Sequence, residues 1–386
     1  MKKILIANRG AAAARILRAV KALGLQSVAV YSEADADLPY VRQADESFCI
    51  GPAPARASYL NQDLLLDVMA RCGADALHPG YGFLSENAQF ARRVEDAGHC
   101  FIGPSSKWIG MLGNKAAARE LMQRHGLQAG GSTGILPGDD MAAVRRAAEA
   151  LGFPVLIKPA GGGGGIGMVP VPDTQSLSES WERASVMAGK AFGNPALYME
   201  RFIRAPRHIE FQFLADRHGN VLSLFERDCS TQRRYQKVIE EAPAPAIDRQ
   251  AVAGMAERLS SILGEIGYDV IGTVEMLYTP DSGFSFLEVN TRLQVEHAIS
   301  EAVTGVDIVQ AQIRLAAGEK LSAVIGAQPV VTGHAIEARV YAEDPVRFLP
   351  SPGVLKTFEL PQSRPGLRIE TGYAQGNRVS SHYDPM

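Results

Sequence analysis

The chain has 386 residues, of which 46% are hydrophobic and 21% are charged, and its formal net charge is −3. This composition is that of a globular protein of two or three domains, and it excludes a disordered chain. Because there is no basic block and no apolar run of membrane-spanning length, neither nucleic acid nor a membrane is an expected partner, and a cytoplasmic protein is expected.

Residues 1–103 alternate between short apolar strands and helical patterns, which predicts an open parallel α/β sheet. The turn ANRG after the first strand has too few glycines for a dinucleotide site, so NAD is not expected. The segment from His78 to Asn87 follows a strand, at the end where open α/β sheets bind ligands. A Pro-Gly turn with a helix cap at Ser85 explains the same residues equally well.

The region from Lys115 onward contains two helical patterns, the second ended by Gly152, and then a strand that carries Lys158. Residues 161–167 follow and are nearly all glycine. A strand comes next, and no Lys-Ser or Lys-Thr pair is present, so this run fits neither a Rossmann turn nor a Walker A loop. Its place between two strands favours a flap that closes over phosphates; a mobile linker is the alternative.

A strand pattern ends near Glu200, and residues 207–230 predict a hairpin joined at residues 216–220. Residues 230–245 are interpreted as a cationic loop. Such a loop either holds an anion or is a solvated set of salt bridges. Its charged residues are Arg233, Arg234, Lys237, Glu240 and Glu241.

Residues 272–297 carry a concentration of acidic side chains within strand patterns. Two runs of β-branched and aromatic residues flank the turn at residues 280–283, which predicts a hairpin. Glu275 and Glu288 therefore lie on neighbouring strands.

The acidic residues of this hairpin predict a metal site. Glu288, Asn290 and Arg292 are two residues apart, so an extended backbone points all three to one face. Glu296 follows, and two carboxylates about 4 Å apart repel by roughly 4 kcal/mol, so a cation is expected among them. Oxygen ligands alone favour Mg²⁺ or Mn²⁺ carrying a phosphate. The alternative is a solvated hairpin whose acids face water.

The rest of the chain predicts a helix at residues 306–318, a linker near Gln328, and then strands and turns. Arg339 lies between apolar neighbours, so it is expected to be partly buried beside an anion. The cysteines are far apart and form no C-x-x-C pair, which favours reduced thiols over a disulfide frame or a zinc site. They are Cys49, Cys72, Cys100 and Cys229.

Eight strings resemble, in the same order along the chain, those of biotin carboxylase, a family of ATP-grasp enzymes. They are ILIANRG, HPGYGFLSEN, FIGP, IKPAGGGGGIGM, ERDCSTQRRYQKVIEEAPAP, FLEVNTRLQVEH, TGVDIVQAQIRLAAG and AEDP…FLPSPG. The resemblance covers essentially the whole chain and implies a multidomain α/β and α+β fold. The implied parts are an open parallel α/β domain (1–110), a helical linker (111–130), an ATP-grasp lid (131–203), an ATP-grasp core with the metal site (204–328) and an incomplete β-rich C-terminal subdomain (329–386).

The resemblance also implies roles for individual residues. Two Mg²⁺ ions, or Mn²⁺, would be held by Glu275, Glu288 and Asn290. Bicarbonate would be bound by Arg292, Gln294 and Val295, and biotin would lie beside Arg339 and Tyr81. Glu296 would be the general base, Lys237 would hold carboxyphosphate, and Arg339 would stabilise the biotin enolate. ATP would be bound by Lys115, Lys158, Gly163, Gly164, Gly165, Met168, Glu200, Arg201, Ile203, His208 and Gln232.

The function implied is carboxylation of biotin on a carrier protein, driven by ATP and bicarbonate through carboxyphosphate. The expected partners are a biotin carboxyl carrier protein, a carboxyltransferase component and a second copy of the chain. Two alternatives stay open, namely another ATP-grasp ligase that makes an acyl phosphate and an impaired ATP-grasp scaffold. Departures from the family pattern motivate the second alternative. They are Ala11 after Gly10, Ile166 in the glycine run and an end at Met386 that is early for the family. Tyr235, where the family often has histidine, is a further departure.

Overall fold

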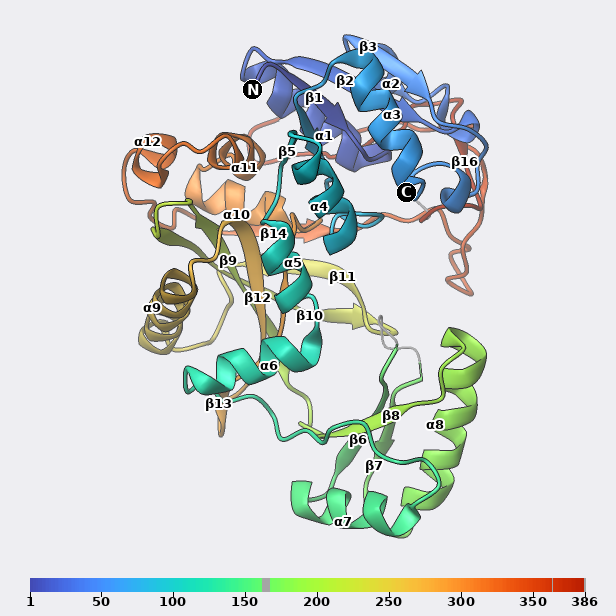
Figure 1. Ribbon diagram of the computed structural model, residues 1–386, viewed down its shortest axis with the longest axis vertical. Coiled ribbons are helices and arrows are strands. Elements are labelled where there is room, and N and C mark those ends of the chain that lie inside the picture. The colour runs from blue at the N-terminus through green and yellow to red at the C-terminus, as the bar shows by residue number, and fades with distance from the viewer. Residues whose placement is uncertain (162–166, 363, 385–386) are drawn as a thin grey trace.

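The computed structural model of the chain describes residues 1–161, 167–362 and 364–384 (Figure 1). It contains a parallel sheet near the N-terminus, a six-stranded antiparallel sheet in the centre, and a small three-stranded sheet at the far end of the molecule. The predicted combination of parallel α/β and antiparallel parts is confirmed. Among the described residues, none of the helices is both long and apolar enough to cross a bilayer.

The parallel sheet confirms the predicted open α/β architecture of the first hundred residues. Its strand order is β3-β2-β1-β4-β5. The strands are β1 (Lys3–Ile6), β2 (Gln26–Tyr31), β3 (Glu46–Cys49), β4 (Ala76–His78) and β5 (Cys100–Phe101). The helices around it are α1 (Gly10–Ala22), α2 (Pro39–Gln43), α3 (Gln62–Cys72), α4 (Ala88–Asp96) and α5 (Ser106–Leu112). Ile4, Leu5 and Ile6 of the central strand β1 are fully buried, as a parallel sheet covered on both faces requires.

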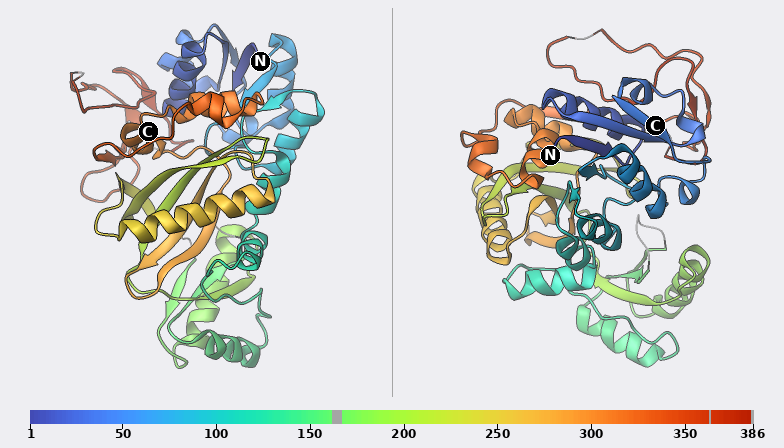
Figure 2. Two further views of the ribbon diagram at one scale, coloured as in Figure 1. Left: turned by 90° about the vertical axis from the view of Figure 1, so that its left-hand side faces the viewer. Right: turned by 45° about the horizontal axis from the view of Figure 1, so that its top comes forward.

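The C-terminal part of the chain packs against the turn that follows β1. The backbone of Gly372 lies so close to Gly10 that a Cβ on Gly372 would be 2.1 Å from the Gly10 carbonyl carbon. Next to it, the Tyr373 hydroxyl accepts a hydrogen bond from Arg9 at 2.9 Å, and Arg9 also pairs with Asp35 at 2.6 Å. The first and last parts of the chain therefore lie side by side (Figure 2). Only glycine fits at position 372.

The small sheet has the order β7-β6-β8 and is antiparallel throughout. Its strands are β6 (Val155–Pro159), β7 (Val169–Val171) and β8 (Leu197–Arg201), with α7 (Met141–Leu151) and α8 (Leu177–Phe192) packed against it. The strands predicted on both sides of the glycine run are thus confirmed. The run itself, including Gly163, Gly164, Gly165 and Ile166, lies outside the described residues.

The central sheet has the order β13-β12-β9-β10-β11-β14. Its strands are β9 (Arg207–Ala215), β10 (Val221–Arg233), β11 (Gln236–Ala242), β12 (Val270–Thr279), β13 (Gly283–Asn290) and β14 (Ala335–Ala338). The helices of this region are α6 (Lys115–Arg124), α9 (Arg249–Ile266), α10 (His297–Thr304), α11 (Ile308–Ala316) and α12 (Leu321–Ile325). Two short strands, β15 (Gly353–Val354) and β16 (Arg378–Val379), pair with each other.

Two local predictions need correction. Most of residues 230–245 are not a loop, because residues 230–233 end β10 and residues 236–242 are β11, with a tight turn at Arg234 and Tyr235 between them. Both turn residues have positive φ, +50° and +67°, as a two-residue type I′ hairpin turn requires. The alternative cap at Ser85 is also wrong, because the Asn87 side chain caps α4 by accepting from the Phe90 N–H at 2.8 Å.

The predicted division of the chain at residues 328 and 329 separates strands of a single sheet. β14 comes from the segment assigned to the C-terminal subdomain, yet it pairs with β11 of the core. This pairing places Arg339, directly after β14, next to the acidic residues of the core. The segment boundaries remain predictions.

Candidate active site

A row of charged side chains crosses four neighbouring strands of the central sheet. Glu288 on β13 pairs with Glu275 on β12, Glu275 pairs with Glu210 on β9, and Glu210 pairs with Arg227 on β10. Residues that are directly opposite in antiparallel strands point to the same face of a sheet. The prediction that Glu275 and Glu288 lie on neighbouring strands is therefore confirmed. Glu210 and Arg227 continue the row on the next two strands.

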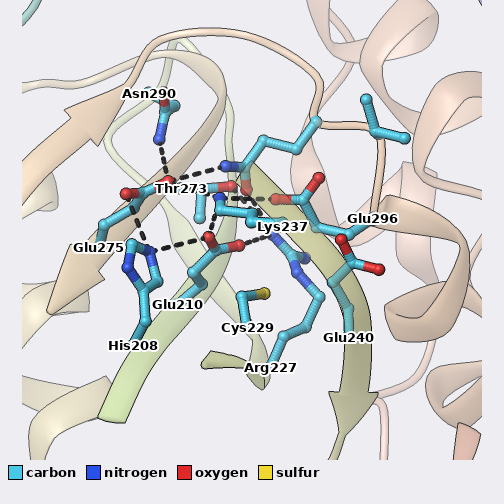
Figure 3. A network of polar contacts seen from close by, with 12 residues as sticks. His208, Glu210, Arg227, Cys229, Lys237, Glu240, Thr273, Glu275, Asn290 and Glu296 are labelled. Carbon is cyan, nitrogen blue, oxygen red and sulfur yellow. Dashed lines mark hydrogen bonds and ion pairs between the residues drawn. The ribbon is translucent and has the colours of Figure 1, made fainter. Parts of the chain in front are cut away.

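Lys237 lies at the centre of this row and compensates its negative charge (Figure 3). Its Nζ is 2.8 Å from Glu275 and 2.8 Å from Glu296, and it also contacts Glu210. Burial, the largest influence, and the Glu275 charge would raise the pKa of Glu210, but Lys237, His208 and Arg227 together outweigh them and lower that pKa to about 2. Burial likewise opposes ionisation of Glu275, yet Lys237 and His208 hold its pKa well below the ordinary value. Both carboxyl groups are therefore ionised at neutral pH.

His208 and Lys115 supply positive charge at the two sides of the acidic row. The Nε2 of His208 is 3.0 Å from Glu275 and 3.2 Å from Glu210. Burial would lower the pKa of His208, but these two carboxylates raise it to about 10. The Nζ of Lys115, in the first turn of α6, is 2.7 Å from Glu288. Each predicted metal-binding carboxylate is thus paired with a side-chain cation.

This arrangement fits a divalent metal ion. Glu275 and Glu288 are in register on one face, and the Asn290 amide donates to Glu275 at 2.7 Å, so three oxygen-bearing side chains lie together. Oxygen ligands without a thiolate suit Mg²⁺ or Mn²⁺. The ammonium groups of Lys115 and Lys237 show that this cluster requires positive charge.

Glu296 lies at the N-terminus of α10 between two cations. It is only 2% exposed, and its second carboxyl oxygen is 2.9 Å from the Arg339 guanidinium, opposite the contact with Lys237. Burial and Glu210 would raise the pKa of Glu296, but Lys237, Arg339 and Arg227 lower it. Glu296 is therefore a carboxylate that can accept a proton. The predicted anionic partners of Arg339 are confirmed as Glu296 and Glu240, the latter at 2.7 Å.

Arg292 extends from the end of β13 to the N-terminal domain. Its Nε donates to Glu86 at 2.8 Å, and its Nη2 donates to Asn290 Oδ1 at 3.0 Å. The neighbouring Gln294 is buried and donates to Glu275 at 3.1 Å. The adjacent residue, Val295, is half-buried. The residues predicted to bind bicarbonate therefore lie directly beside the hairpin of β12 and β13, which carries the predicted metal ligands.

Tyr81 belongs to the segment that follows β4 and is half-buried. Burial raises the pKa of its hydroxyl, and the charges of Glu337 and Arg339 also act on that hydroxyl. Tyr81 thus lies on the Arg339 side of the site, as predicted for a residue beside biotin. The position of biotin itself remains a prediction.

The remaining described residues predicted to bind ATP lie on or next to the small sheet, except Gln232, which lies on β10 of the central sheet. Lys158 on β6 is 2.5 Å from Glu200 on β8, and Arg119 of α6 also contacts Glu200. Glu200 is therefore held by two cations. Near the small sheet, Met168 and Ile203 are half-buried and Arg201 is exposed. On β10, Gln232 donates to the Cys229 carbonyl at 2.9 Å. Their contacts with a nucleotide remain predictions.

Four charged residues of this site had no assigned role in the sequence analysis. Glu210 and Arg227 belong to a hairpin that was predicted, and the alternation of His208, Glu210 and Gln212 along β9 shows that they share one face. Glu86 lies in the segment from His78 to Asn87, for which ligand binding was one of two alternatives. Glu240 was included in the predicted loop. The period of two along β9 could have identified Glu210.

The whole chain matches known family models and solved structures. The biotin carboxylase N-terminal domain matches residues 1–109, the ATP-binding domain of the carbamoyl-phosphate synthase L chain matches 114–324, and the biotin carboxylase C-terminal domain matches 337–386. A biotin carboxylase of Pseudomonas aeruginosa is 49% identical over 100% of this chain and 85% of the relative. The alpha subunit of methylcrotonoyl-CoA carboxylase from Arabidopsis thaliana is 46% identical over 100% of this chain and 53% of its own length.

Two similar crystal structures carry ligands related to this chemistry. The biotin carboxylase of Campylobacter jejuni, in a β,γ-ATP complex, has a TM-score of 0.93 and 42% identity over 100% of this chain and 85% of its own. The biotin carboxylase domain of the Hydrogenobacter thermophilus 2-oxoglutarate carboxylase is a dimer with MgADP, ADP and bicarbonate. Its TM-score is 0.92, with 42% identity over 100% of this chain and 84% of its own. Sequence and fold therefore agree along the full chain, which belongs to the biotin carboxylase family of ATP-grasp enzymes and has its ATP- and bicarbonate-dependent activity.

Proposed function

We propose that this site converts bicarbonate into carboxyphosphate with ATP and then carboxylates biotin carried by a partner protein. The observation that carries this proposal is the buried position of Glu296 between Lys237 and Arg339, at 2.8 Å and 2.9 Å. A carboxylate between two cations, next to an acidic metal cluster, can remove a proton from a small anion while the cations stabilise the additional charge.

Several cationic side chains are suited to neutralise the phosphates of ATP. Lys115 and His208 lie beside the carboxylates, and Lys158 projects from the small sheet. Glu275 and Glu288, with Asn290, would hold Mg²⁺ or Mn²⁺, which offsets phosphate charge when it is bound. Because phosphoryl transfer depends on positioning and charge stabilisation, these residues orient the γ-phosphate toward the bicarbonate site.

Bicarbonate would be held by Arg292, Gln294 and Val295, next to Glu296. Glu296 takes the bicarbonate proton, and a bicarbonate oxygen then attacks the γ-phosphorus as the bond to ADP breaks. The products of this step are ADP and carboxyphosphate. The ammonium of Lys237 is placed to stay with the anionic intermediate because it already contacts Glu275 and Glu296.

Carboxyphosphate would break down to CO₂ and phosphate, and phosphate would take the ureido proton of biotin. The biotin nitrogen then forms a bond to CO₂. Arg339 stabilises the enolate that this proton transfer creates, and Tyr81 lies beside the ring. Exclusion of water protects carboxyphosphate from hydrolysis, a role for which the glycine run is suited.

The carboxylated biotin would be attached to a carrier protein and delivered to a carboxyltransferase component. The proposed assembly is a homodimer in the cytoplasm. Support comes from the relatives that are subunits of larger carboxylases and from the dimer of the Hydrogenobacter thermophilus domain.

The test is ADP release by the purified chain with Mg²⁺ and ATP, with bicarbonate and free biotin added singly and together. ADP release is expected to depend on bicarbonate and to increase with biotin, and labelled bicarbonate should appear in carboxybiotin. ADP release that ignores both compounds would contradict the proposal. An acceptor other than biotin that supports turnover would favour a different ATP-grasp ligase.

A further inference from the structure

Two glutamates face each other at the edge of the central sheet. Glu240 on β11 pairs directly with Glu337 on β14, so both side chains leave the same face of the sheet. Like charges directly opposite on neighbouring strands are destabilising. The Oε2 atoms of Glu240 and Glu337 are both buried, and neither has a hydrogen-bond partner within the part of the chain that the structure describes.

The cations near this pair are already committed to other groups. Arg339 donates through Nε to the other oxygen of Glu240 at 2.7 Å, and its Nη2 contacts Glu296 at 2.9 Å. The guanidinium of Arg227 contacts Glu210 and the side chain of Gln294. The charged and titratable groups near Glu337 are Glu240 on β11, Arg339 directly after β14, Glu296 at the start of α10, Arg227 on β10 and Tyr81 in the N-terminal domain.

Among the described residues, the cations that act on Glu337 are Arg339 and Arg227, and both already contact other side chains, so a second ionised carboxylate would have to compete for them. Two carboxyl groups that share a site cannot both ionise readily, because each charge opposes the other. Burial, then Glu240 and Glu296, raises the pKa of Glu337 to about 8, although Arg339 and Arg227 oppose this. Burial also raises the pKa of Glu240. Glu337 therefore carries a proton at neutral pH, directly opposite Glu240.

We propose that Glu337 is a positioning residue, which shares this proton with Glu240 so that Glu240 holds the guanidinium of Arg339 in place for biotin. The inference deepens the proposed function, because Arg339 is the residue assigned there to the biotin enolate. When the proton leaves, Glu337 becomes a second anion within reach of Arg339. The guanidinium then has a competing partner and loses its orientation between Glu240 and Glu296.

An infrared experiment tests the shared proton without any substrate. A protonated carboxylic acid has a carbonyl stretching band that a carboxylate lacks. In the wild-type protein, the difference spectrum between pH 6.5 and pH 9.5 should show loss of such a band, and Glu337→Gln should remove this signal. Glu241→Gln is the matched control, because Glu241 is the next residue on β11 and contacts His334 at 2.6 Å. An unchanged band in Glu337→Gln would overturn the proposal, whatever reaction the protein catalyses.

A kinetic experiment tests the effect on Arg339. The KM for free biotin is expected to rise by about ten-fold between pH 7 and pH 9.5 in the wild-type enzyme, while the KM for ATP changes little, because loss of one proton changes an equilibrium about ten-fold per pH unit. Glu337→Gln mimics the protonated acid and should flatten the biotin profile, whereas Glu337→Ala should raise the biotin KM at all pH values. The positioning role would be overturned if the biotin KM had the same pH profile in wild type and Glu337→Gln. It would also be overturned if the biotin KM of Glu337→Gln were no lower than that of Glu337→Ala.

Discussion

Arg292, at the end of β13, donates a hydrogen bond to Glu86 of the N-terminal domain at 2.8 Å. A second bond at 3.3 Å joins the Thr291 N–H to the same carboxylate. Glu86 therefore fixes the direction of a guanidinium that belongs to another part of the chain. This contact connects the strand-end segment after β4 to the site assigned to bicarbonate.

Replacing Glu86 with Gln should raise the KM for bicarbonate and leave the KM for ATP within two-fold. The increase is expected to be about five-fold, since a partly exposed ion pair contributes about 1 kcal/mol. Steady-state kinetics with varied bicarbonate measures it. Asp63→Asn is the control, because Asp63 forms an exposed ion pair with Arg93 elsewhere in the same domain. A bicarbonate KM equal to that of the control would contradict the role of Glu86.

Replacing Glu296 with Gln should leave the Kd of Mg-ATP within a few-fold and reduce kcat by about 10²- to 10⁴-fold, the usual effect of removing a general base. Calorimetric titration and ADP release measure the two quantities. Glu265→Gln on the exposed face of α9 serves as the control. Equal losses of ATP binding and turnover would show instead that Glu296 supports the structure.

The ratio of the ATP affinity with Mg²⁺ to that without Mg²⁺ measures the contribution of the metal. Replacing Glu288 with Gln should reduce this ratio by about ten-fold or more, the range seen when metal sites lose a supporting group. Titrations with ATP in Mg²⁺ and after removal of Mg²⁺ by a chelator give this ratio. Asp281→Asn tests a carboxylate in the exposed turn of the same hairpin. If the ratio is the same for wild type and Glu288→Gln, Glu288 does not hold the metal.

Replacing Arg227 with Met should lower the free energy of unfolding by about 3–5 kcal/mol, because it leaves buried partners without their cation. The guanidinium is completely buried and contacts Glu210 at 3.1 Å and Gln212 at 2.9 Å. Urea unfolding measures the loss. Arg71→Met removes an exposed pair with Asp67 and should change stability by less than about 0.5 kcal/mol. A loss no larger than that of Arg71→Met would refute this account.

The buried His78 should make the protein less stable in acid. Its Nδ1 accepts the Gly80 N–H at 3.0 Å, and burial, with Arg15 and His297, lowers its pKa to about 3. The unfolded chain therefore binds a proton near pH 6.5 that the folded chain does not bind until about pH 3. The contribution of neutral His78 to the free energy of unfolding is therefore fully present above pH 6.5. It falls at lower pH by up to about 1.4 kcal/mol per pH unit.

Urea unfolding between pH 7 and pH 5 measures this dependence. The variant His78→Asn is expected to start from a lower stability, because its shorter side chain leaves space in the core, but to have a smaller slope against pH. The slope is the informative quantity, since the starting stability also reflects packing. An equal slope in the variant would assign the acid sensitivity to other groups.

Elements with strong local signals could be predicted from the sequence. The turn at residues 280–283 and the strand patterns beside it predict the hairpin of β12 and β13, and the register of this hairpin places Glu275 opposite Glu288. The hairpin between β10 and β11 was missed because its turn residues, Arg234 and Tyr235, lack the Gly, Asn or Asp expected at positive φ. The local sequence therefore resembled a loop.

Relationships between distant strands could not be predicted. The neighbours of Glu275 depend on the pairing of β12 with β9, and β9 is more than fifty residues earlier in the chain. The contact of Arg339 with Glu240 similarly requires β14 to join the core sheet at β11. Strand order is a property of the whole fold, and no periodicity within one segment encodes it.

The close approach of Gly372 to Gly10 has a consequence for biosynthesis. Tyr373 and Val379 belong to the same apolar core as Ile4, Ile6 and Ile16, so residues made more than 350 positions later complete a core that begins near the N-terminus. Domains generally fold during synthesis from the N-terminus. The nascent N-terminal domain must therefore emerge with part of its apolar surface uncovered until residues 372–379 have been made, which predicts that a chaperone captures chains stalled before residue 372.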